Sequence, residues 1–197
     1  MEPRLERAVM ILRRGGVVAY PTDTLYGLAV DPRLADAVAK LFSVKARDPG
    51  HAIPLIAADA GQVDEAAVMT PTARRLAEVF WPGPLSLILE SRPSITAQVC
   101  ATDGSVAIRI PASDVARALA TGLGFCITST SANLSGEPPS ADPRAVWLSL
   151  GDLVDDVLDA GRSPGGPPST IVDARGPGVR LVRAGAVAWE RVLESLQ

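Results

Sequence analysis

Residues 17–28 read VVAYPTDTLYGL. The apolar run at 17–20 has the length and composition of a short buried strand, and Pro21 ends it. A helical pattern follows at 34–42, so this region predicts a strand, a turn and then a helix. The turn carries two threonine hydroxyls, a carboxylate and a phenol directly after the strand. Ligand sites of α/β folds lie at such strand ends, so we expect a site here.

The sequence on either side repeats this alternation of strands and helices. Helical patterns lie at 3–14, 71–80, 114–123 and 189–196, and apolar strand-like runs lie at 54–57, 85–89, 106–110, 125–127, 169–172 and 179–182. Proline and glycine gather at 81–84, 136–139 and 163–168, which we interpret as loops. We therefore expect an α/β or α+β sheet covered by helices, in one domain over residues 1–197.

Composition excludes several classes of protein. The 197 residues are 47% hydrophobic and 21% charged, which is typical of a globular chain that needs no disulfide or metal. The net charge of −3 disfavours a uniformly basic nucleic-acid binder. Cys100, Cys126 and His51 lack metal-site spacing, and we find neither a signal-peptide pattern nor an apolar run of membrane-spanning length. We expect a reduced, cytoplasmic protein without a membrane partner.

Two short motifs near the N-terminal half allow a functional and a purely structural interpretation. Thr22 and Asp23 could contact a ligand, or they could form a side-chain turn at the strand exit. Lys45 and Arg47 stand one residue apart at the end of a helical pattern, and Lys45 is one of only two lysines. The two cations could grip a phosphate, or they could interact favourably with the helix C-terminus.

A hydroxyl-rich segment follows the strand-like run at 125–127. Six of the nine residues at 128–136 carry a hydroxyl or an amide, and none carries a carboxylate. This composition suits hydrogen bonds to phosphate oxygens. The segment matches neither the phosphate loop nor the dinucleotide-binding glycine motif. A serine hydrolase is disfavoured, because only His51 could serve as the imidazole base.

Arg109 lies inside an otherwise apolar run at 106–111, and Arg183 ends another strand-like run. A guanidinium within a strand needs an anionic partner, which is either a protein carboxylate or a carboxylate of a ligand. The sequence leaves both options open for each arginine.

Taken in order, these segments resemble the YrdC/Sua5 family of threonylcarbamoyl-AMP synthases, in its short single-domain (TsaC-like) form. The matching segments are 20–28, 45–47, 54–56, 81–86, 106–111, 131–136, 168–173 and 181–185. The resemblance implies a twisted, mostly parallel or mixed sheet, flanked by helices, with a large concave cleft. We expect no C-terminal Sua5 domain.

The activity that the resemblance implies is condensation of L-threonine, bicarbonate and ATP into threonylcarbamoyl-AMP, with release of pyrophosphate. This is the first step of the threonylcarbamoyladenosine (t6A) modification of tRNA. Positioning and charge stabilisation are expected to outweigh acid–base catalysis. Mg²⁺ is expected on the ATP phosphates and not in a protein metal site. The product is expected to pass to a downstream threonylcarbamoyl transferase complex, and a direct contact with tRNA stays open.

The family's functional residues correspond to ten positions of this chain. By resemblance, Lys45 and Arg47 meet the ATP phosphates and are the catalytic cations. The further ATP contacts are Ser105, Ser129, Ser131, Asn133 and Arg183, and the threonine contacts are Thr24, Arg109 and Ser169. Arg109 is expected to pair with the carboxylate of the amino acid.

The loop from Arg47 to Pro54 departs from the family pattern. Ile53 stands before Pro54 where a polar residue is common, and the loop is longer and contains His51. His51 could contact the nucleotide from a shifted position, or it could be a solvated loop residue.

Three other functions stay as alternatives. The first is an RNA-binding module of the same fold without catalysis, which the acidic balance and the scarcity of lysine disfavour. The second is a carbamoyl-adenylate step on another acceptor, which the resemblance associates with longer multidomain carbamoyltransferases. The third, a scaffold, does not need such a set of cations and hydroxyls.

Overall fold

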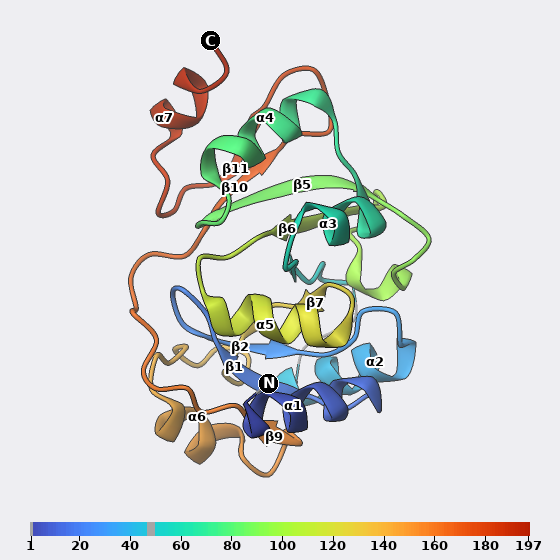
Figure 1. The fold of residues 1–197 in the computed structure, drawn as a ribbon, viewed down its shortest axis with the longest axis vertical. Coiled ribbons are helices and arrows are strands. Elements are labelled where there is room, and N and C mark those ends of the chain that lie inside the picture. The colour runs from blue at the N-terminus through green and yellow to red at the C-terminus, as the bar shows by residue number, and fades with distance from the viewer. Residues whose placement is uncertain (1, 47–49) are drawn as a thin grey trace.

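The structure is a computed structural model that describes residues 2–46 and 50–197. Its strands form two sheets (Figure 1). The first sheet has the order β8 (Thr130–Ser131), β2 (Tyr26–Ala29), β1 (Val18–Pro21), β9 (Asp156–Val157). The second has the order β11 (Arg180–Arg183), β10 (Thr170–Asp173), β5 (Leu85–Ser91), β6 (Ser105–Arg109), β3 (Leu55–Ile56), β7 (Ile127–Thr128), and β4 (Ala67–Val68) also pairs with β5.

The strands pair in both directions. The β1–β9, β5–β10 and β3–β6 pairs are parallel, and the other six pairs among the described residues are antiparallel. The expected mixed α/β architecture is confirmed. Within it, antiparallel pairs outnumber parallel ones, and two sheets replace the single sheet that the sequence suggested.

Residues 17–28 form most of a β-hairpin. β1 and β2 are antiparallel, with Pro21 opposite Tyr26. Thr22 closes the turn, because its N–H and its hydroxyl both donate to the carbonyl of Leu25, at 3.2 and 2.7 Å. The structural interpretation of Thr22 as a turn residue is therefore confirmed. The strand is followed by a second strand before the helix begins, which the sequence pattern did not predict.

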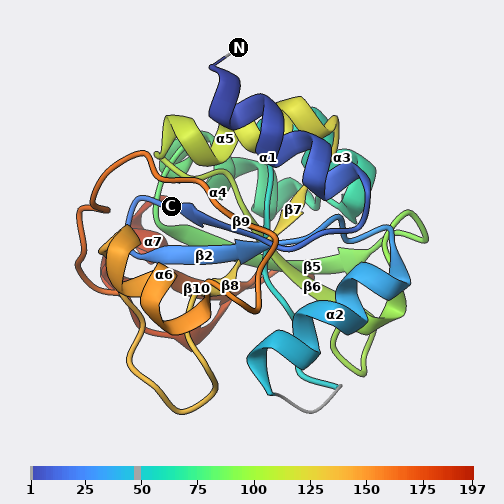
Figure 2. The ribbon, with the colours of Figure 1, turned by 90° about the horizontal axis from the view of Figure 1, so that it is seen from below.

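The helices flank these strands. They are α1 (Pro3–Arg13), α2 (Ala35–Lys45), α3 (Ala60–Ala66), α4 (Pro71–Phe80), α5 (Asp114–Leu123), α6 (Pro143–Leu150) and α7 (Trp189–Glu194), with a 3-10 turn η1 (Ala97–Val99). Figure 2 shows α1 and α5 together on one side of the first sheet, with α2 and α6 on the other side. In the part of the chain that the structure describes, no helix has the length and apolar composition needed to cross a membrane.

β1 and β3 each contribute side chains to two hydrophobic clusters. They can do so because successive side chains of a strand point to opposite faces. In β1, Ala19 faces the larger cluster, whereas Val18 and Tyr20 face the smaller cluster under α1 and α5. In β3, Leu55 and Ile56 divide in the same way. Full burial of such an aliphatic side chain contributes roughly 1.5–3 kcal/mol. Burial on both faces therefore fixes the positions of β1 and β3, and with them the positions of the polar residues that follow these strands.

Candidate active site

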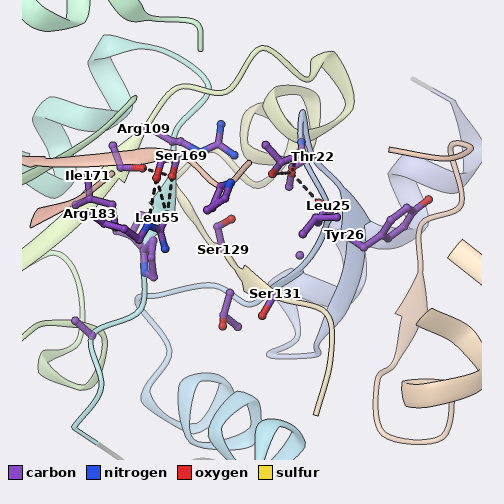
Figure 3. A pocket seen from close by; sticks show the side chains of 17 residues that line it. Thr22, Leu25, Tyr26, Leu55, Arg109, Ser129, Ser131, Ser169, Ile171 and Arg183 are labelled. Atoms are coloured by element: carbon purple, nitrogen blue, oxygen red, sulfur yellow. Dashed lines mark hydrogen bonds between the residues drawn. The ribbon is translucent and has the colours of Figure 1, made fainter. Parts of the chain in front are cut away.

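A cavity of about 410 Å³ lies where the two sheets meet, and its walls come from distant parts of the chain (Figure 3). The chain crosses from the second sheet to the first at Ser129, which lies between β7 and β8. The residues that line the cavity are Thr22, Thr24, Leu25, Tyr26, Gly27, Ala52, Pro54, Leu55, Ser86, Arg109, Ser129, Thr130, Ser131, Pro168, Ser169, Ile171 and Arg183. Hydroxyls and two guanidinium groups supply its polar atoms, and none of these lining residues has a carboxylate.

Arg109 enters this cavity from the end of β6 and is held by Asp23. Its Nη1 lies 2.7 Å from Oδ1 and 2.8 Å from Oδ2 of Asp23, and the two side chains are only 8% and 12% exposed. Asp23 also accepts a hydrogen bond from the N–H of Ala112. A protein carboxylate is thus one partner of Arg109. Within the described residues, nothing accepts a hydrogen bond from its Nε or Nη2, so part of the guanidinium stays available to a ligand.

Arg183 reaches the same cavity from β11 and has only neutral partners among the described residues. Its Nη2 donates to the carbonyl of Ser169 at 2.8 Å and to the Ser169 hydroxyl at 3.2 Å. The hydroxyl of Ser86 lies 3.0 Å from that of Ser169. Burial, and after it the positive charge of Arg109, lower the pKa of Arg183 from its ordinary value. Two guanidinium groups that repel each other across one cavity favour an anionic ligand between them.

The hairpin and the crossing segment supply the neutral donors. Thr24 lines the cavity, and its hydroxyl lies 3.2 Å from the hydroxyl of Thr22. The N–H of Ser129 donates to the carbonyl of Pro54 at 2.7 Å, which fixes the backbone where the two sheets join. Behind Ser129, the fully buried Tyr20 donates from its hydroxyl to the carbonyl of Thr128. Burial raises the pKa of Tyr20, and a hydrogen bond with the Ser129 side chain partly offsets that rise.

A second cavity of about 420 Å³ adjoins the first, because Thr130 and Ser131 line both. Its other lining residues are Lys45, Ala46, His51, Asn133, Ser135 and Gly136. Lys45 is 5% exposed, and its Nζ donates to the carbonyls of Ser131 and Asn133 at 2.6 and 2.7 Å and to Oδ1 of Asn133 at 2.8 Å. The ammonium group is thus directed at the loop that follows β8.

The structure brings together eight of the ten predicted positions. Thr24, Arg109, Ser129, Ser131, Ser169 and Arg183 line the first cavity, and Lys45, Ser131 and Asn133 line the second. Arg47 lies outside the described residues.

Ser105 does not join this group. It begins β6, whereas Arg109 ends the same strand, and Ser105 lines neither cavity. Its side chain bonds Asp103 instead, and this contact together with Arg175 lowers the pKa of that carboxyl to about 2. Because a strand advances about 3.3 Å per residue, Ser105 lies roughly 13 Å along β6 from Arg109. Its assignment as an ATP contact stays a prediction.

Several contributors to the site were missed by the sequence reasoning. Ser86, which touches Ser169, stood in the matching segment 81–86 but was not singled out. Ser135 lines the second cavity and stood in the hydroxyl-rich segment. Tyr20 stood in the matching segment 20–28 and was interpreted as a strand residue, and no sequence signal marks its contact with Ser129. Among the described residues, no group of histidine, cysteine, aspartate or glutamate side chains is arranged to hold a metal ion.

Comparisons with known proteins agree with this geometry. The Sua5_yciO_yrdC family model, described as telomere recombination, matches residues 10–185. A protein of Mycobacterium tuberculosis (strain H37Rv) is 37% identical over 190 residues, which are 96% of this chain and 87% of its own. The threonylcarbamoyl-AMP synthase of Bacillus subtilis (strain 168) is 33% identical over 97% of this chain and 56% of its own. The crystal structure of P. abyssi Sua5 complexed with L-threonine superposes with a TM-score of 0.92 at 29% identity, over 98% of this chain and 57% of that one.

Proposed function

This chain belongs to the Sua5/YciO/YrdC family, and from that premise we propose that it is a threonylcarbamoyl-AMP synthase. It condenses L-threonine, bicarbonate and ATP and releases pyrophosphate, which is the first step of threonylcarbamoyladenosine formation in tRNA. The observation that carries the proposal is the pair of guanidinium groups, Arg109 and Arg183, over one hydroxyl-lined cavity that continues into a second polar cavity. Such a site suits an amino acid carboxylate beside a nucleotide.

The first cavity is the place for L-threonine in this proposal. Arg109 offers its unused donors to the carboxylate of the amino acid, while Asp23 holds the other side of the guanidinium. Thr24 provides a hydroxyl from the hairpin, and Ser169 provides one from the residue before β10. Figure 3 shows the hairpin residue Thr22 and Ser169 on different sides of the cavity. The P. abyssi Sua5 structure is a complex with L-threonine, which supports this assignment for a chain of the same fold.

ATP occupies the remaining walls and the second cavity. Ser129 and Ser131 offer hydroxyls on the segment that joins the sheets, and Arg183 offers charge from β11. Arg47 is assigned to the phosphates by resemblance alone. Mg²⁺ is proposed to arrive on the phosphates of ATP, because the lining residues offer cations and hydroxyls but no carboxylate that would bind a metal.

The chemistry that follows from this placement depends on positioning. Bicarbonate releases hydroxide to give carbon dioxide. The amine of threonine attacks the carbon of carbon dioxide, and the proton that the nitrogen loses combines with this hydroxide to give water and a carbamate. A carbamate oxygen then forms a bond to the α-phosphorus while the bond to the β-phosphate oxygen breaks, and pyrophosphate leaves. Arg183 and the hydroxyls of Ser129 and Ser131 stabilise the charge on the phosphates, and Arg109 orients the nucleophile. No histidine or carboxylate among the described lining residues of the first cavity offers a general base.

The partners beyond these substrates are also proposals. The adenylate product would pass to a transferase complex that modifies tRNA, and the protein would work in the cytoplasm as one domain over residues 1–197. RNA binding without catalysis is not favoured, because the net charge is −3 and the cavities are built for small anions.

Release of pyrophosphate tests the proposed activity directly. The assay contains ATP, Mg²⁺ and bicarbonate, and compares L-threonine with L-serine, L-valine and no amino acid. We expect release that needs both bicarbonate and L-threonine. Release that ignores either substrate, or no release together with salt-sensitive binding of RNA, contradicts the proposal.

A further inference from the structure

The loop at residues 131–136, which starts at the last residue of β8, is attached to the end of α2 by Lys45. Its Nζ donates to the carbonyls of Ser131 and Asn133 and to the Asn133 side chain, at 2.6, 2.7 and 2.8 Å. Its own carbonyl accepts a hydrogen bond from the N–H of Ser135 at 3.1 Å. Both ends of the residue therefore hold the same loop.

These contacts occupy the donors of Lys45. An ammonium group has three N–H donors and no acceptor. Three short hydrogen bonds to the loop match that number, and the hydroxyl of Ser131 lies at 3.3 Å as a weaker fourth neighbour. A phosphate oxygen would have to displace a bond that a buried charge needs. The geometry does not present Lys45 as a free phosphate ligand.

Asn133 is engaged in the same way. Its Oδ1 accepts from Lys45, and its Nδ2 donates to the carbonyls of Leu134 and Glu137. The side chain is buried, although the residue lines the second cavity. Both the oxygen and the nitrogen of the amide are thus used inside the loop and not toward the cavity.

We propose that Lys45 and Asn133 are positioning residues, which hold the loop at 131–136 in its binding shape before the nucleotide arrives. The groups that touch the nucleotide are then the hydroxyls of Ser131 and Ser135, which line the second cavity. This differs from the expectation that Lys45 itself meets the phosphates. The identity of the ligand as ATP rests on the proposed function, whereas the contacts that hold the loop do not. A preformed loop lowers the ordering cost of binding.

Amide hydrogen exchange of the free protein tests whether Lys45 holds the loop. We expect exchange across residues 131–137 to become about tenfold faster or more in Lys45→Met and in Asn133→Ala, because each loses hydrogen bonds to a charged group. Asn133→Ala keeps the charge of Lys45, so a shared effect does not come from charge alone. Lys40→Met is the matched control, since the other lysine lies on the same helix and pairs with Asp155 at an exposed position.

Calorimetric titration with ATP and with L-threonine tests whether this holding matters for the ligand. Each single substitution should weaken ATP binding about ten- to hundredfold while L-threonine affinity stays within about threefold. The ATP affinity of the double variant Lys45→Met/Asn133→Ala should lie within about threefold of that of the weaker-binding single variant. The reason is that either single substitution already loosens the loop. A purely structural role would leave ATP affinity unchanged in variants that remain folded.

One combination of results overturns the proposal. If exchange in the free protein is unchanged in Lys45→Met while ATP affinity falls, Lys45 contacts the nucleotide directly. If the wild type binds no ATP, the proposed function fails, and the exchange experiment still decides whether Lys45 holds the loop.

Discussion

Asp23→Asn should destabilise the protein strongly, because it leaves Arg109 as a buried charge without a partner. The guanidinium Nη1 lies 2.7 and 2.8 Å from the two carboxylate oxygens, and the pair is 8% and 12% exposed. Removal of one partner from a buried pair costs about 3–5 kcal/mol. For a chain of this length each kcal/mol lowers Tm by about 2–4 °C, so we expect a fall of roughly 6–20 °C.

A surface pair of the same chain provides the control. Asp64 and Arg74 lie 2.8 Å apart, but their side chains are 39% and 51% exposed. Such exposed pairs contribute about 0–1 kcal/mol, so Asp64→Asn should change the free energy of unfolding by no more than that. Urea unfolding of both variants at one pH gives the comparison. If Asp23→Asn costs no more than Asp64→Asn, the pair is not buried as the structure shows it.

Arg109→Met separates the structural role of this pair from its proposed ligand. A ligand at a hundred times its Kd stabilises the folded state by about 2.7 kcal/mol. L-threonine should therefore raise the Tm of the wild type, and should not raise that of Arg109→Met. The double variant Asp23→Asn/Arg109→Met should be more stable than Asp23→Asn alone, since no buried charge is left over. An undiminished shift with L-threonine in Arg109→Met would show that the carboxylate binds elsewhere.

Three further predictions concern Arg183, the two tyrosines and the two cysteines. Arg183→Met should weaken ATP binding about tenfold or more by calorimetry, because a guanidinium that lines the cavity is lost; unchanged affinity contradicts its assignment. Burial raises the pKa of Tyr26 to about 12 and also raises that of Tyr20. The neutral phenols thus stabilise the fold fully below about pH 10, and this contribution is lost as the pH rises through the pKa values of the folded protein. Tyrosinate absorbance near pH 10 should therefore appear in the urea-unfolded protein and not in the native protein. Cys126 is fully buried and Cys100 is partly exposed, so a disulfide reagent should label Cys100 alone in the native protein and both thiols after unfolding.

The helices that the sequence predicted best are two whose N-cap side chains accept a hydrogen bond from the first turn. The structure places α4 and α5 at the predicted residues 71–80 and 114–123. Thr70 and Ser113 accept hydrogen bonds from the N–H groups of the first turns, and Gly124 ends α5 with a φ of 81°. These local signals act through the backbone and need no tertiary contact.

The elements that the sequence missed are short or lack periodicity. All four residues of β2 are buried, so the strand shows no alternation of apolar and polar side chains. The eight-residue helix α6 was also missed, although Asp142 followed by Pro143 is a typical helix start and Asp142 does accept a hydrogen bond from the N–H of Arg144.

The sequence predicted which residue types line the site better than it predicted their partners. Arg109 was assigned to a ligand carboxylate, and the structure adds Asp23 as a protein partner. Lys45 was assigned to phosphates, and the structure directs it to the carbonyls of a loop. An arginine or lysine in a motif shows that an acceptor is needed. The acceptor itself is set by tertiary packing, which brings residues 86 and 88 positions apart into contact in these two cases.

The two arginines of the first cavity are held in different ways, and this difference explains how the site can be both stable and attractive to anions. Asp23 forms an ion pair with Nη1 of Arg109, so the fold keeps one guanidinium in place without a ligand. In the described part of the chain, Arg183 is held by neutral oxygens of Ser169 and by no carboxylate, so the positive charge of Arg109 still acts on it. An anion that enters between them removes this repulsion and takes over donors that the protein leaves unused. Folding thus places the two guanidinium groups for an anion before the anion binds. The affinity for anions should decline as the salt concentration rises, because salt screens the more exposed Arg183.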